Sequence, residues 1–244
     1  MVRRVTHHST GLREKPHRPV NSDVRAQVIM SRDRLIRTFD LAYECLRRKI
    51  NGGRIRVDNE ASLQLQFASI LKSVGELFEV ERDEFFSLEL EKAISLKGGA
   101  FGKSGTNKAK IDVFFSFTNS STGESVSCAV EMKFFKKKNY REPNNRYDVF
   151  ADIKNLESYG TYADYCFLLV ATDHNHYVSQ QSYSPDTADF DFRHGRTYVS
   201  GTPAIYRTRN PYGSPIVLSR SYSFSWDTTA GGLHFLKLPV EPTL

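Results

Sequence analysis

Residues 110–135, KIDVFFSFTNSSTGESVSCAVEMKFF, decide the fold, because two apolar runs flank a short polar turn. Segments 110–117 and 125–135 are rich in β-branched and aromatic residues, which favour strands. Between them, residues 119–123 (NSSTG) have the composition of a tight turn. The sequence therefore predicts a β-hairpin in which these two strands lie side by side.

Side chains alternate between the two faces of a strand, so the residues of each predicted strand fall into two sets. In 125–135 one set is entirely apolar: Val126, Cys128, Val130, Met132 and Phe134. The other set is Ser127, Ala129, Glu131 and Lys133. In 110–117 the apolar set is Ile111, Val113, Phe115 and Phe117, and Asp112 is on the opposite face. The pattern predicts that Asp112, Glu131 and Lys133 converge on one face of the sheet.

This convergence favours metal-assisted hydrolysis of a phosphodiester bond. Two carboxylates on neighbouring strands offer the oxygen ligands that Mg²⁺ prefers, and Mg²⁺ keeps several waters and contacts substrate phosphate. The ion lowers the pKa of water, and a nearby lysine offsets charge in the transition state. The ordinary alternative is a solvent-facing Glu-x-Lys pair without a chemical role. Asp112 and Glu131 are therefore candidate metal ligands, and Lys133 completes the candidate catalytic set.

Helical and strand patterns continue on both sides of the hairpin. Apolar residues at helical spacing predict helices near 31–50, 58–75 and 145–159. Between the second helix and the hairpin, residues 77–90 have the pattern of an extended segment, and the apolar run 165–171 predicts a buried strand. The resulting order of elements is helix, strand, strand, strand, helix, strand. This order predicts an α/β fold with a mixed β-sheet flanked by helices.

The chain divides into three parts by composition. Residues 1–30 are polar, basic and broken by prolines, which predicts a flexible basic arm. Residues 31–176 form the expected core, and the glycine-rich stretch 97–107 within it is a loop that matches no phosphate-binding motif. Residues 177–244, rich in Ser, Tyr, Thr and Pro, predict an irregular β extension packed on the core. In this extension, 232–238 can pair with the short β-like run 215–218 or 221–226.

The spacing of the candidate residues resembles that of the PD-(D/E)xK nuclease superfamily, which has the restriction-endonuclease-like fold. Ile111-Asp112 is followed, after 18 intervening residues, by Glu131-Met132-Lys133, and the resemblance covers residues 58–173. It implies a core of helix, three-stranded meander, helix and strand. It also implies a metal-binding acid at Asp112, a second acid at Glu131 and the family lysine at Lys133. The implied cofactor is Mg²⁺, for which Mn²⁺ can substitute.

Many members of this superfamily add an acidic residue from the first core helix, and Glu60 is in that place. Glu60 precedes Leu63 and Phe67 by three and seven residues, so helical spacing puts it on the side of the helix that faces the sheet. A solvated carboxylate that complements the helix dipole is the alternative. Glu60 is therefore a candidate third contributor to the metal site.

The chain departs from the superfamily pattern at some positions. Ile111 is at the position of the motif proline, and the superfamily often replaces this proline. The helix near 145–159 carries Asp152, Lys154 and Tyr159 where RecB-like members carry a glutamine and a tyrosine, so no subgroup is assigned. Asp148 and Asp152 are expected at the surface. The sequence DHNH at 173–176 is interpreted as a loop close to the active-site end of the last core strand.

Positive charge is concentrated in the first quarter of the chain. Residues 1–56 hold 14 Lys and Arg against 5 Asp and Glu, and the remaining 188 residues hold 20 against 23. Such asymmetry favours a polyanionic partner, although a solubilising tail followed by a solvated helix face explains it equally well. Directly after the strand 125–135, Lys136, Lys137, Lys138 and Arg141 are the candidate nucleic-acid-binding residues.

The composition also bears on the compartment. The longest apolar run is far shorter than the ~20 residues that span a bilayer, so we expect no membrane association. Cys45, Cys128 and Cys166 are far apart, form no CxxC motif and lie in apolar surroundings. They are interpreted as core thiols of a reducing compartment, and the expected localisation is cytoplasmic.

Three hypotheses remain at this stage. The first is a divalent-metal-dependent nuclease, with DNA a more plausible substrate than RNA, an endonuclease favoured and a homodimer left open. The second is a nucleic-acid-binding module of the same fold without cleavage activity. The third is a basic interaction or structural protein without metal chemistry, in which Asp112, Glu131 and Lys133 do not converge.

Overall fold

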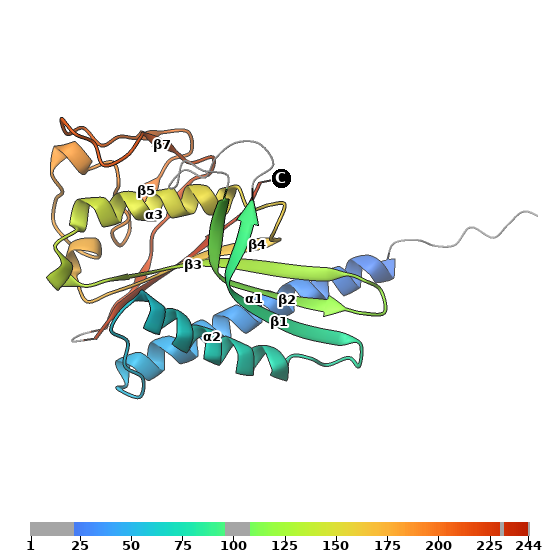
Figure 1. The fold of residues 1–244 in the computed structure, drawn as a ribbon. Coiled ribbons are helices and arrows are strands. Elements are labelled where there is room, and N and C mark those ends of the chain that lie inside the picture. Colours follow the sequence, from blue (N-terminus) through green and yellow to red (C-terminus); the bar gives the residue numbers. More distant parts are fainter. Residues whose placement is uncertain (1–21, 96–107, 230–231, 244) are drawn as a thin grey trace, which may run out of the picture.

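The structure is a computed structural model that describes residues 22–95, 108–229 and 232–243. Within these ranges, six strands form one sheet in the order β1-β2-β3-β4-β10-β9, with helices against both faces (Figure 1). β3 and β4 run parallel, and the other neighbouring pairs are antiparallel. The mixed α/β class expected from the sequence is confirmed.

Three α-helices and six strands make up this layered core in the described part of the chain. The helices are α1 (Ser22–Asn51), α2 (Glu60–Leu77) and α3 (Glu142–Glu157). The strands of the sheet are β1 (Glu84–Ser95), β2 (Lys108–Asn119), β3 (Ser125–Phe135), β4 (Tyr165–Thr172), β9 (Trp226–Asp227) and β10 (His234–Val240). The short elements are η1 (Lys137–Asn139), η2 (Asn175–Tyr177), η3 (Pro185–Thr187) and the pairs β5 (Thr197–Tyr198) with β8 (Tyr222–Ser223) and β6 (Pro203–Ala204) with β7 (Ile216–Val217).

The expected helices are present, but the first one is longer than predicted. α1 begins at Ser22 instead of Ser31, so the assignment of 22–30 to a flexible arm is wrong. This stretch has neither proline nor glycine and contains good helix formers, which extend the helix toward the N-terminus. Residues 1–21 of the predicted arm and the predicted loop 97–107 lie outside the described residues.

Two apolar cores lie on opposite faces of the sheet. The first packs α1 and α2 against the sheet, and its rings Phe39 and Phe167 are stacked with centroids 3.9 Å apart. The second packs α3 and the C-terminal segment against the other face. The alternation predicted for β3 is confirmed, because Cys128, Val130, Met132 and Phe134 belong to the first core and Ala129 belongs to the second.

β1 and β2 bend together toward α3 part of the way along their length (Figure 1). The register of β2 with β3 runs as far as Val113 opposite Val130, and beyond this pair the two strands part. There Asp112 Oδ2 accepts a hydrogen bond from the backbone N–H of Met132 at 2.6 Å. On β1 the bend coincides with Glu91, whose φ of 54° lies in the left-handed region that non-glycine residues rarely adopt. The predicted hairpin is present, and its strands separate at the candidate site.

The bend changes the core that Ile111 enters. Alternation predicted that Ile111 shares an apolar face with Val113 and Phe115. Instead, Ile111 is fully buried in the second core, whereas Val113 is in the first. The prediction of one continuous apolar face is therefore wrong at this residue, because the strand turns at Asp112.

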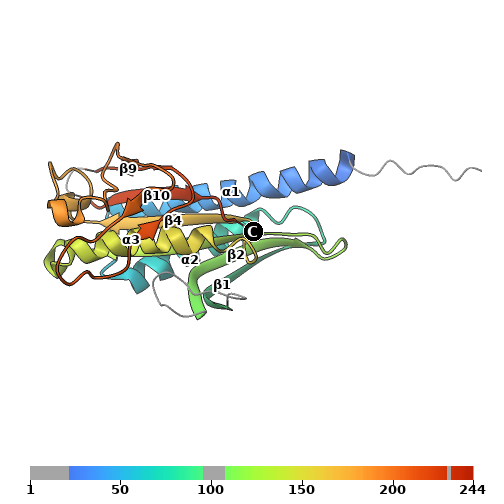
Figure 2. The same cartoon turned by 90° about the horizontal axis from the view of Figure 1, so that it is seen from above.

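The C-terminal segment contributes a strand to the central sheet. β10 pairs with β4 from His234 opposite Thr172 to Val240 opposite Cys166, and it lies beside β4 in Figure 2. The same strand pairs with β9 through Leu236 and Trp226, in agreement with one of the two predicted pairings. The expected extension is thus partly a sheet strand, and some of its other aromatic residues, such as Phe190 and Phe224, pack against α3. Across the described ranges, no helix has both the length and the apolar composition required to cross a membrane.

Gly75 in α2 permits close contact with β1. A Cβ atom at this position would lie 2.4 Å from the Phe86 ring, which packs against Phe115 and Phe117 and is not free to move aside. Gly75→Ala gains about 1 kcal/mol of helix propensity but incurs overpacking of about 1–3 kcal/mol. We expect a net loss of about 1 kcal/mol by chemical denaturation. Ser73→Ala, at an exposed position of the same helix, should cause no loss, and equal stability of the two variants would contradict this packing.

Candidate functional site

A pocket of about 280 Å³ opens where β2 separates from β3, on the side of the sheet that faces α3. Its acidic lining residues are Glu60, Asp112, Glu131 and Asp152, and its basic lining residues are Lys108, Lys110 and Lys133. Ala109, Asn155 and Tyr159 complete the lining. The three residues predicted to converge therefore line one pocket, together with the candidate third contributor.

Asp112 is held where the strands part. Besides the bond from Met132 N–H to its carboxylate, its backbone carbonyl accepts a hydrogen bond of 2.5 Å from the Gln64 side chain of α2. The same Gln64 amide donates to Glu91 at 3.2 Å. Gln64 therefore ties α2 to both strands at the bend and fixes the position of the Asp112 backbone.

Burial and neighbouring charges raise the pKa of two carboxylates in the pocket. Burial raises the pKa of Asp112 to about 6, and the charges of Glu60 and Asp152 add to the rise. Lys133 and the Met132 N–H act in the opposite direction. Burial also raises the pKa of Glu131 well above its ordinary value, with contributions from Asp112 and Asp152. Carboxylates crowded in this way are typical of sites that bind a cation or move protons.

Glu131 is almost completely buried, with 6% of its surface exposed. The hydroxyl of Tyr159 donates a hydrogen bond of 2.9 Å to Glu131 Oε1. Tyr159 follows the last turn of α3 and is itself buried, so it approaches the Glu131 carboxylate from the α3 side of the sheet. The contact orients Glu131 and satisfies one of its oxygens.

Lys133 is a buried cation surrounded by acids. Its ammonium lies 3.1 Å from Asp152 Oδ2 and 3.5 Å from Glu60 Oε1, and it donates to the Met132 carbonyl at 2.8 Å. Burial alone would lower the pKa of Lys133, but the neighbouring acids, Asp152 first, hold it well above its ordinary value. Lys133 therefore remains protonated at neutral pH.

Glu60 occupies the first turn of α2 and also reaches the site. Asn59 and Ser62 form a capping box, in which each side chain bonds to the backbone N–H of the other, and this box fixes the start of the helix. Glu60 Oε2 accepts a hydrogen bond from Phe134 N–H at 3.3 Å, while 45% of its side chain is exposed. It combines the two roles considered from the sequence, a helix-start carboxylate and a pocket residue.

Asp148 and Asp152 are buried, so the prediction that they lie at the surface is wrong. Asp152 is 2% exposed and contacts Lys133, and Asp148 is 8% exposed near the hydroxyl of Tyr212. The sequence contained a signal for Asp152. It lies three residues after Val149 and four before Leu156, on the apolar face of the predicted helix. Asn155, an amide one methylene shorter than glutamine, also lines the pocket.

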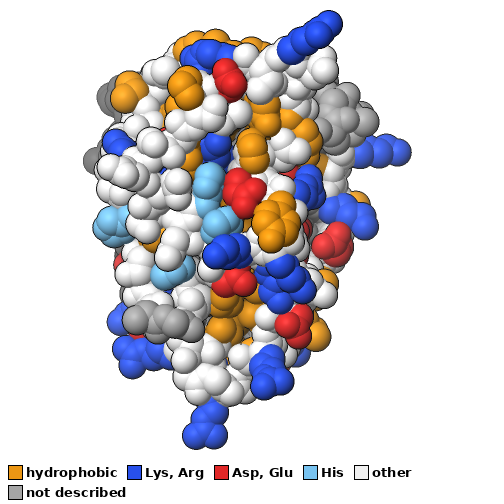
Figure 3. All heavy atoms as spheres, turned by 90° about the vertical axis from the view of Figure 1, so that its left-hand side faces the viewer, with side chains coloured by type: hydrophobic (Ala, Val, Ile, Leu, Met, Phe, Trp, Pro, Cys, Tyr) orange, Lys and Arg blue, Asp and Glu red, His pale blue; other side chains and the backbone are white. Residues whose placement is uncertain are grey.

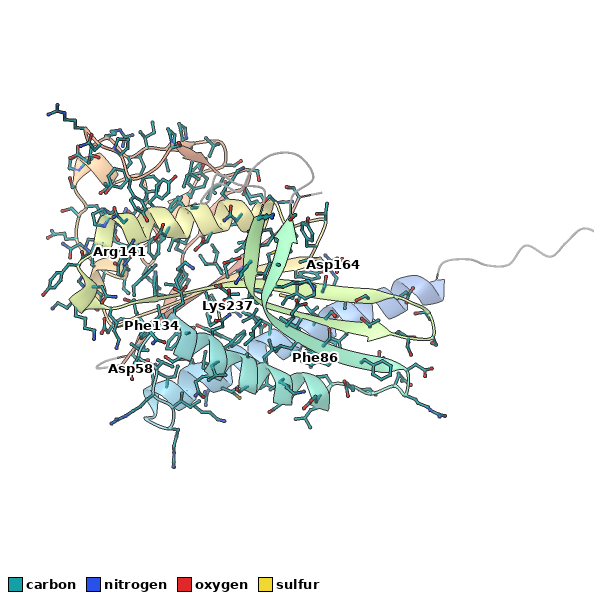
Figure 4. The ribbon with its side chains drawn as sticks, in the orientation of Figure 1. Asp58, Phe86, Phe134, Arg141, Asp164 and Lys237 are labelled. Carbon is teal, nitrogen blue, oxygen red and sulfur yellow. The ribbon has the colours of Figure 1, made fainter. Side chains whose placement is uncertain are left out.

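The four basic residues after β3 differ in their contacts and exposure. Lys136 points its ammonium at Asp58, 3.3 Å away, and Lys137 and Lys138 are exposed on η1. Arg141 lines a second pocket beside the first. Figure 4 shows Arg141 at the start of α3, at the same end of the molecule as Phe134 and Asp58. The structure thus brings Arg141 alone of these four to the lining of a pocket at the site.

The segment 173–176 lies next to this end of the sheet. Asp173 Oδ1 accepts a hydrogen bond from Lys137 N–H at 2.7 Å, and His174 Nε2 lies 2.9 Å from Glu142 Oε1. These contacts join the end of β4 to η1 and α3, which agrees with the interpretation of 173–176 as a loop near the site.

The donor set of the pocket is compatible with Mg²⁺. In the described part of the chain, no three acidic, histidine or cysteine side chains are grouped as a ready-made metal site. Mg²⁺ does not need such a group, because it is usually held by one or two carboxylates and completes its coordination with water and substrate oxygens. Asp112 and Glu131 supply two crowded carboxylates, whereas Asp152 faces Lys133.

No protein-family model, curated protein or solved structure matches this chain. The chemistry of the site is therefore inferred from its own geometry: two strands that part, four carboxylates and one buried ammonium.

The Tyr159 hydroxyl should contribute to stability. Tyr159→Phe removes the donor to Glu131 and leaves a buried carboxylate oxygen without this bond, which costs about 1–3 kcal/mol. Urea denaturation of the variant should show this loss. Tyr140→Phe is the control, because Tyr140 is 82% exposed and its hydroxyl is in water. Equal stability of both variants would mean that the Tyr159–Glu131 contact is not formed.

Proposed function

We propose that this chain is a divalent-metal-dependent nuclease that hydrolyses phosphodiester bonds, with Asp112, Glu131 and Lys133 as its catalytic residues. The observation that carries the proposal is the meeting of four carboxylates and one buried lysine in a single pocket. A solvent-facing Glu-x-Lys pair does not explain this site, since Glu131 is 6% and Lys133 8% exposed. Burying charged groups costs desolvation free energy, and clusters of buried titratable groups in a cleft are typical of functional sites.

The order of elements supports the resemblance to the restriction-endonuclease-like fold. α2 is followed by the meander β1-β2-β3, by α3 and then by β4, which lies parallel to β3. Asp112 is on the second strand of the meander, Glu131 and Lys133 are on the third, and Glu60 begins the first core helix. These are the positions that the resemblance implies. α1, β9 and β10 are additions outside that core.

Asp112 and Glu131 are the proposed ligands of a Mg²⁺ ion, which Mn²⁺ can replace. When bound, the ion would supply positive charge to the substrate phosphate and lower the pKa of a water molecule. The protein anchors each ligand through one oxygen, Asp112 by the Met132 N–H and Glu131 by the Tyr159 hydroxyl. Such anchoring contacts orient carboxylate ligands in metal sites.

Lys133 acts as a fixed positive charge. Because its pKa is well above the ordinary value, it does not accept a proton from water at neutral pH. Its ammonium is held by Asp152 and Glu60 at the pocket, where it can donate to a phosphate oxygen or orient a water molecule. A charge placed in advance offsets the negative charge that develops in the transition state. Asp152 and Glu60 position Lys133 in this scheme.

The proposed substrate is nucleic acid, with DNA favoured over RNA and endonuclease action favoured over cleavage from an end. Incubation of the purified chain with circular and linear, single- and double-stranded DNA and RNA tests the proposal. We expect Mg²⁺-dependent cleavage of at least one DNA substrate, inhibition by EDTA and recovery when excess Mg²⁺ is added. Cutting of circles identifies an endonuclease. Binding without cleavage across the panel would contradict the proposal and favour a binding module.

A further inference from the structure

A second pocket, of about 230 Å³, adjoins the first. Glu60 and Lys133 line both pockets, so the two meet at the contact between these side chains. The second pocket extends past the end of β3 to Arg141, at the start of α3. The two pockets share the lining residues Glu60 and Lys133, and we call the two pockets together the two-pocket groove.

Exposed cations line both pockets of the two-pocket groove, four carboxylates line the first pocket, and Asp148 lines the second together with Glu60. Lys108 and Lys110 line the first pocket from the beginning of β2, and both are exposed. Arg141 lines the second pocket and is also exposed. Figure 3 shows the left-hand end of Figure 1, where Lys and Arg side chains alternate with acidic ones and a few histidines lie beside them. Exposed cations in both pockets suit a chain of phosphates, one of which meets a cation bound by the carboxylates of the first pocket.

Arg141 contacts the C-terminal segment beside the second pocket. Its guanidinium donates to the hydroxyl of Tyr212 at 3.4 Å, and this hydroxyl also lies 3.4 Å from Asp148 Oδ1. The Tyr212 ring packs edge-on against Tyr147 of α3. Gly213 makes this approach feasible, since a Cβ there would lie 2.2 Å from the Tyr147 hydroxyl. The segment after residue 177 thus contacts Arg141 and α3 beside the second pocket.

We propose that a single nucleic-acid strand crosses the site through the two-pocket groove. Lys108 and Lys110 bind phosphates on one side of the scissile bond, and Arg141 binds a phosphate on the other side. This inference rests on the proposed nuclease function and adds the path of the strand and three substrate-binding residues. A double-stranded substrate would place one strand in the groove.

The test measures binding of a short labelled DNA single strand at several salt concentrations, in Ca²⁺, with gels to confirm that the DNA stays intact. Each phosphate contact to a single strand contributes about 0.7 to the slope of log affinity against log salt. Lys108→Ala/Lys110→Ala should lower the slope by about 1.4, and Arg141→Ala by about 0.7. The control is Lys72→Ala/Arg82→Ala, which removes two exposed charges. Lys72 lies twelve residues after Glu60, about 18 Å along α2.

A second arm localises the contacts. Neutral methylphosphonates are placed singly along the strand, and the loss of affinity is measured in the wild type and in each variant. At the phosphate that Arg141 binds, the methylphosphonate should have no further effect in Arg141→Ala, because the contact is already lost. If the wild type binds but the groove variants behave like the control, the proposed path is wrong while the nuclease proposal stands. Failure of the wild type to bind or cut any nucleic acid would overturn both.

Discussion

Replacing Lys133 with methionine is expected to lower the free energy of unfolding by about 3–5 kcal/mol and the cleavage rate at least about a hundredfold. Methionine fills nearly the same volume, so the cost comes from the lost charge. Without the ammonium, Asp152, which is 2% exposed, would have to keep its charge in a nearly dry environment beside Glu131. Removing one partner of a buried ion pair is costly for this reason.

A second substitution separates the two roles of Lys133. Asp152→Asn removes the charge that Lys133 balances, so Lys133→Met/Asp152→Asn should regain most of the lost stability. Activity should not recover, because the positive charge needed near the phosphate is still absent. Urea denaturation and single-turnover cleavage of the three variants measure the two effects separately.

Lys72→Met is the matched control for this pair. Lys72 forms an exposed ion pair with Glu76 on α2, and such surface pairs contribute about 0–1 kcal/mol. If Lys133→Met were no less stable than Lys72→Met, the buried pair would not be formed as described. If the double variant regained activity together with stability, Lys133 would have a structural role only.

Asp112→Asn and Glu131→Gln should each lower cleavage at least about a thousandfold, since a bound cation contributes several kcal/mol to the transition state. The fold should be preserved. The asparagine oxygen can still accept from Met132 N–H, and the glutamine oxygen can still accept from the Tyr159 hydroxyl. Because burial raises the pKa of Asp112 to about 6, its charge is unfavourable in the metal-free fold. Asp112→Asn should therefore be at least as stable as the wild type in EDTA.

Glu89→Gln provides the control for these two variants. Glu89 is an exposed residue of β1 that pairs with Lys92, outside the pocket. Its cleavage rate should equal that of the wild type. Undiminished cleavage by purified Asp112→Asn or Glu131→Gln would place the active site elsewhere. A variant that is inactive and also unfolded by circular dichroism would show that the carboxylate supports the fold instead.

The sequence predicted the centre of the sheet and the site because β3 has strict alternation. One face of 125–135 is entirely apolar and packs against α1 and α2. Glu131 and Lys133 alternate with these residues, so they point to the other side of the sheet. The short turn after β2 then placed Asp112 on a neighbouring strand. These conclusions need only the period of a strand and the reach of a hairpin.

The features that were missed depend on tertiary contacts. Ile111 is in the second core and not in the expected one, because β2 bends at Asp112, where Gln64 of α2 binds the strand. The alternation of side chains along a strand does not predict such a bend. Asp152 was assigned to the surface, although its spacing from Val149 and Leu156 puts it on the apolar face of the helix. Lys133, the partner that permits the burial of Asp152, is on another element. β10 joined the sheet because β4 offered an open edge.

The most direct test of the proposed metal site is the position of the ion. Crystals of the chain grown with Mn²⁺ and a short DNA strand should give an anomalous difference peak in contact with the carboxylates of Asp112 and Glu131. The Lys133 ammonium should lie beside the DNA phosphate that contacts this ion. A peak bound by other residues, or intact DNA in the groove with no ion at these two carboxylates, would contradict the proposed metal site.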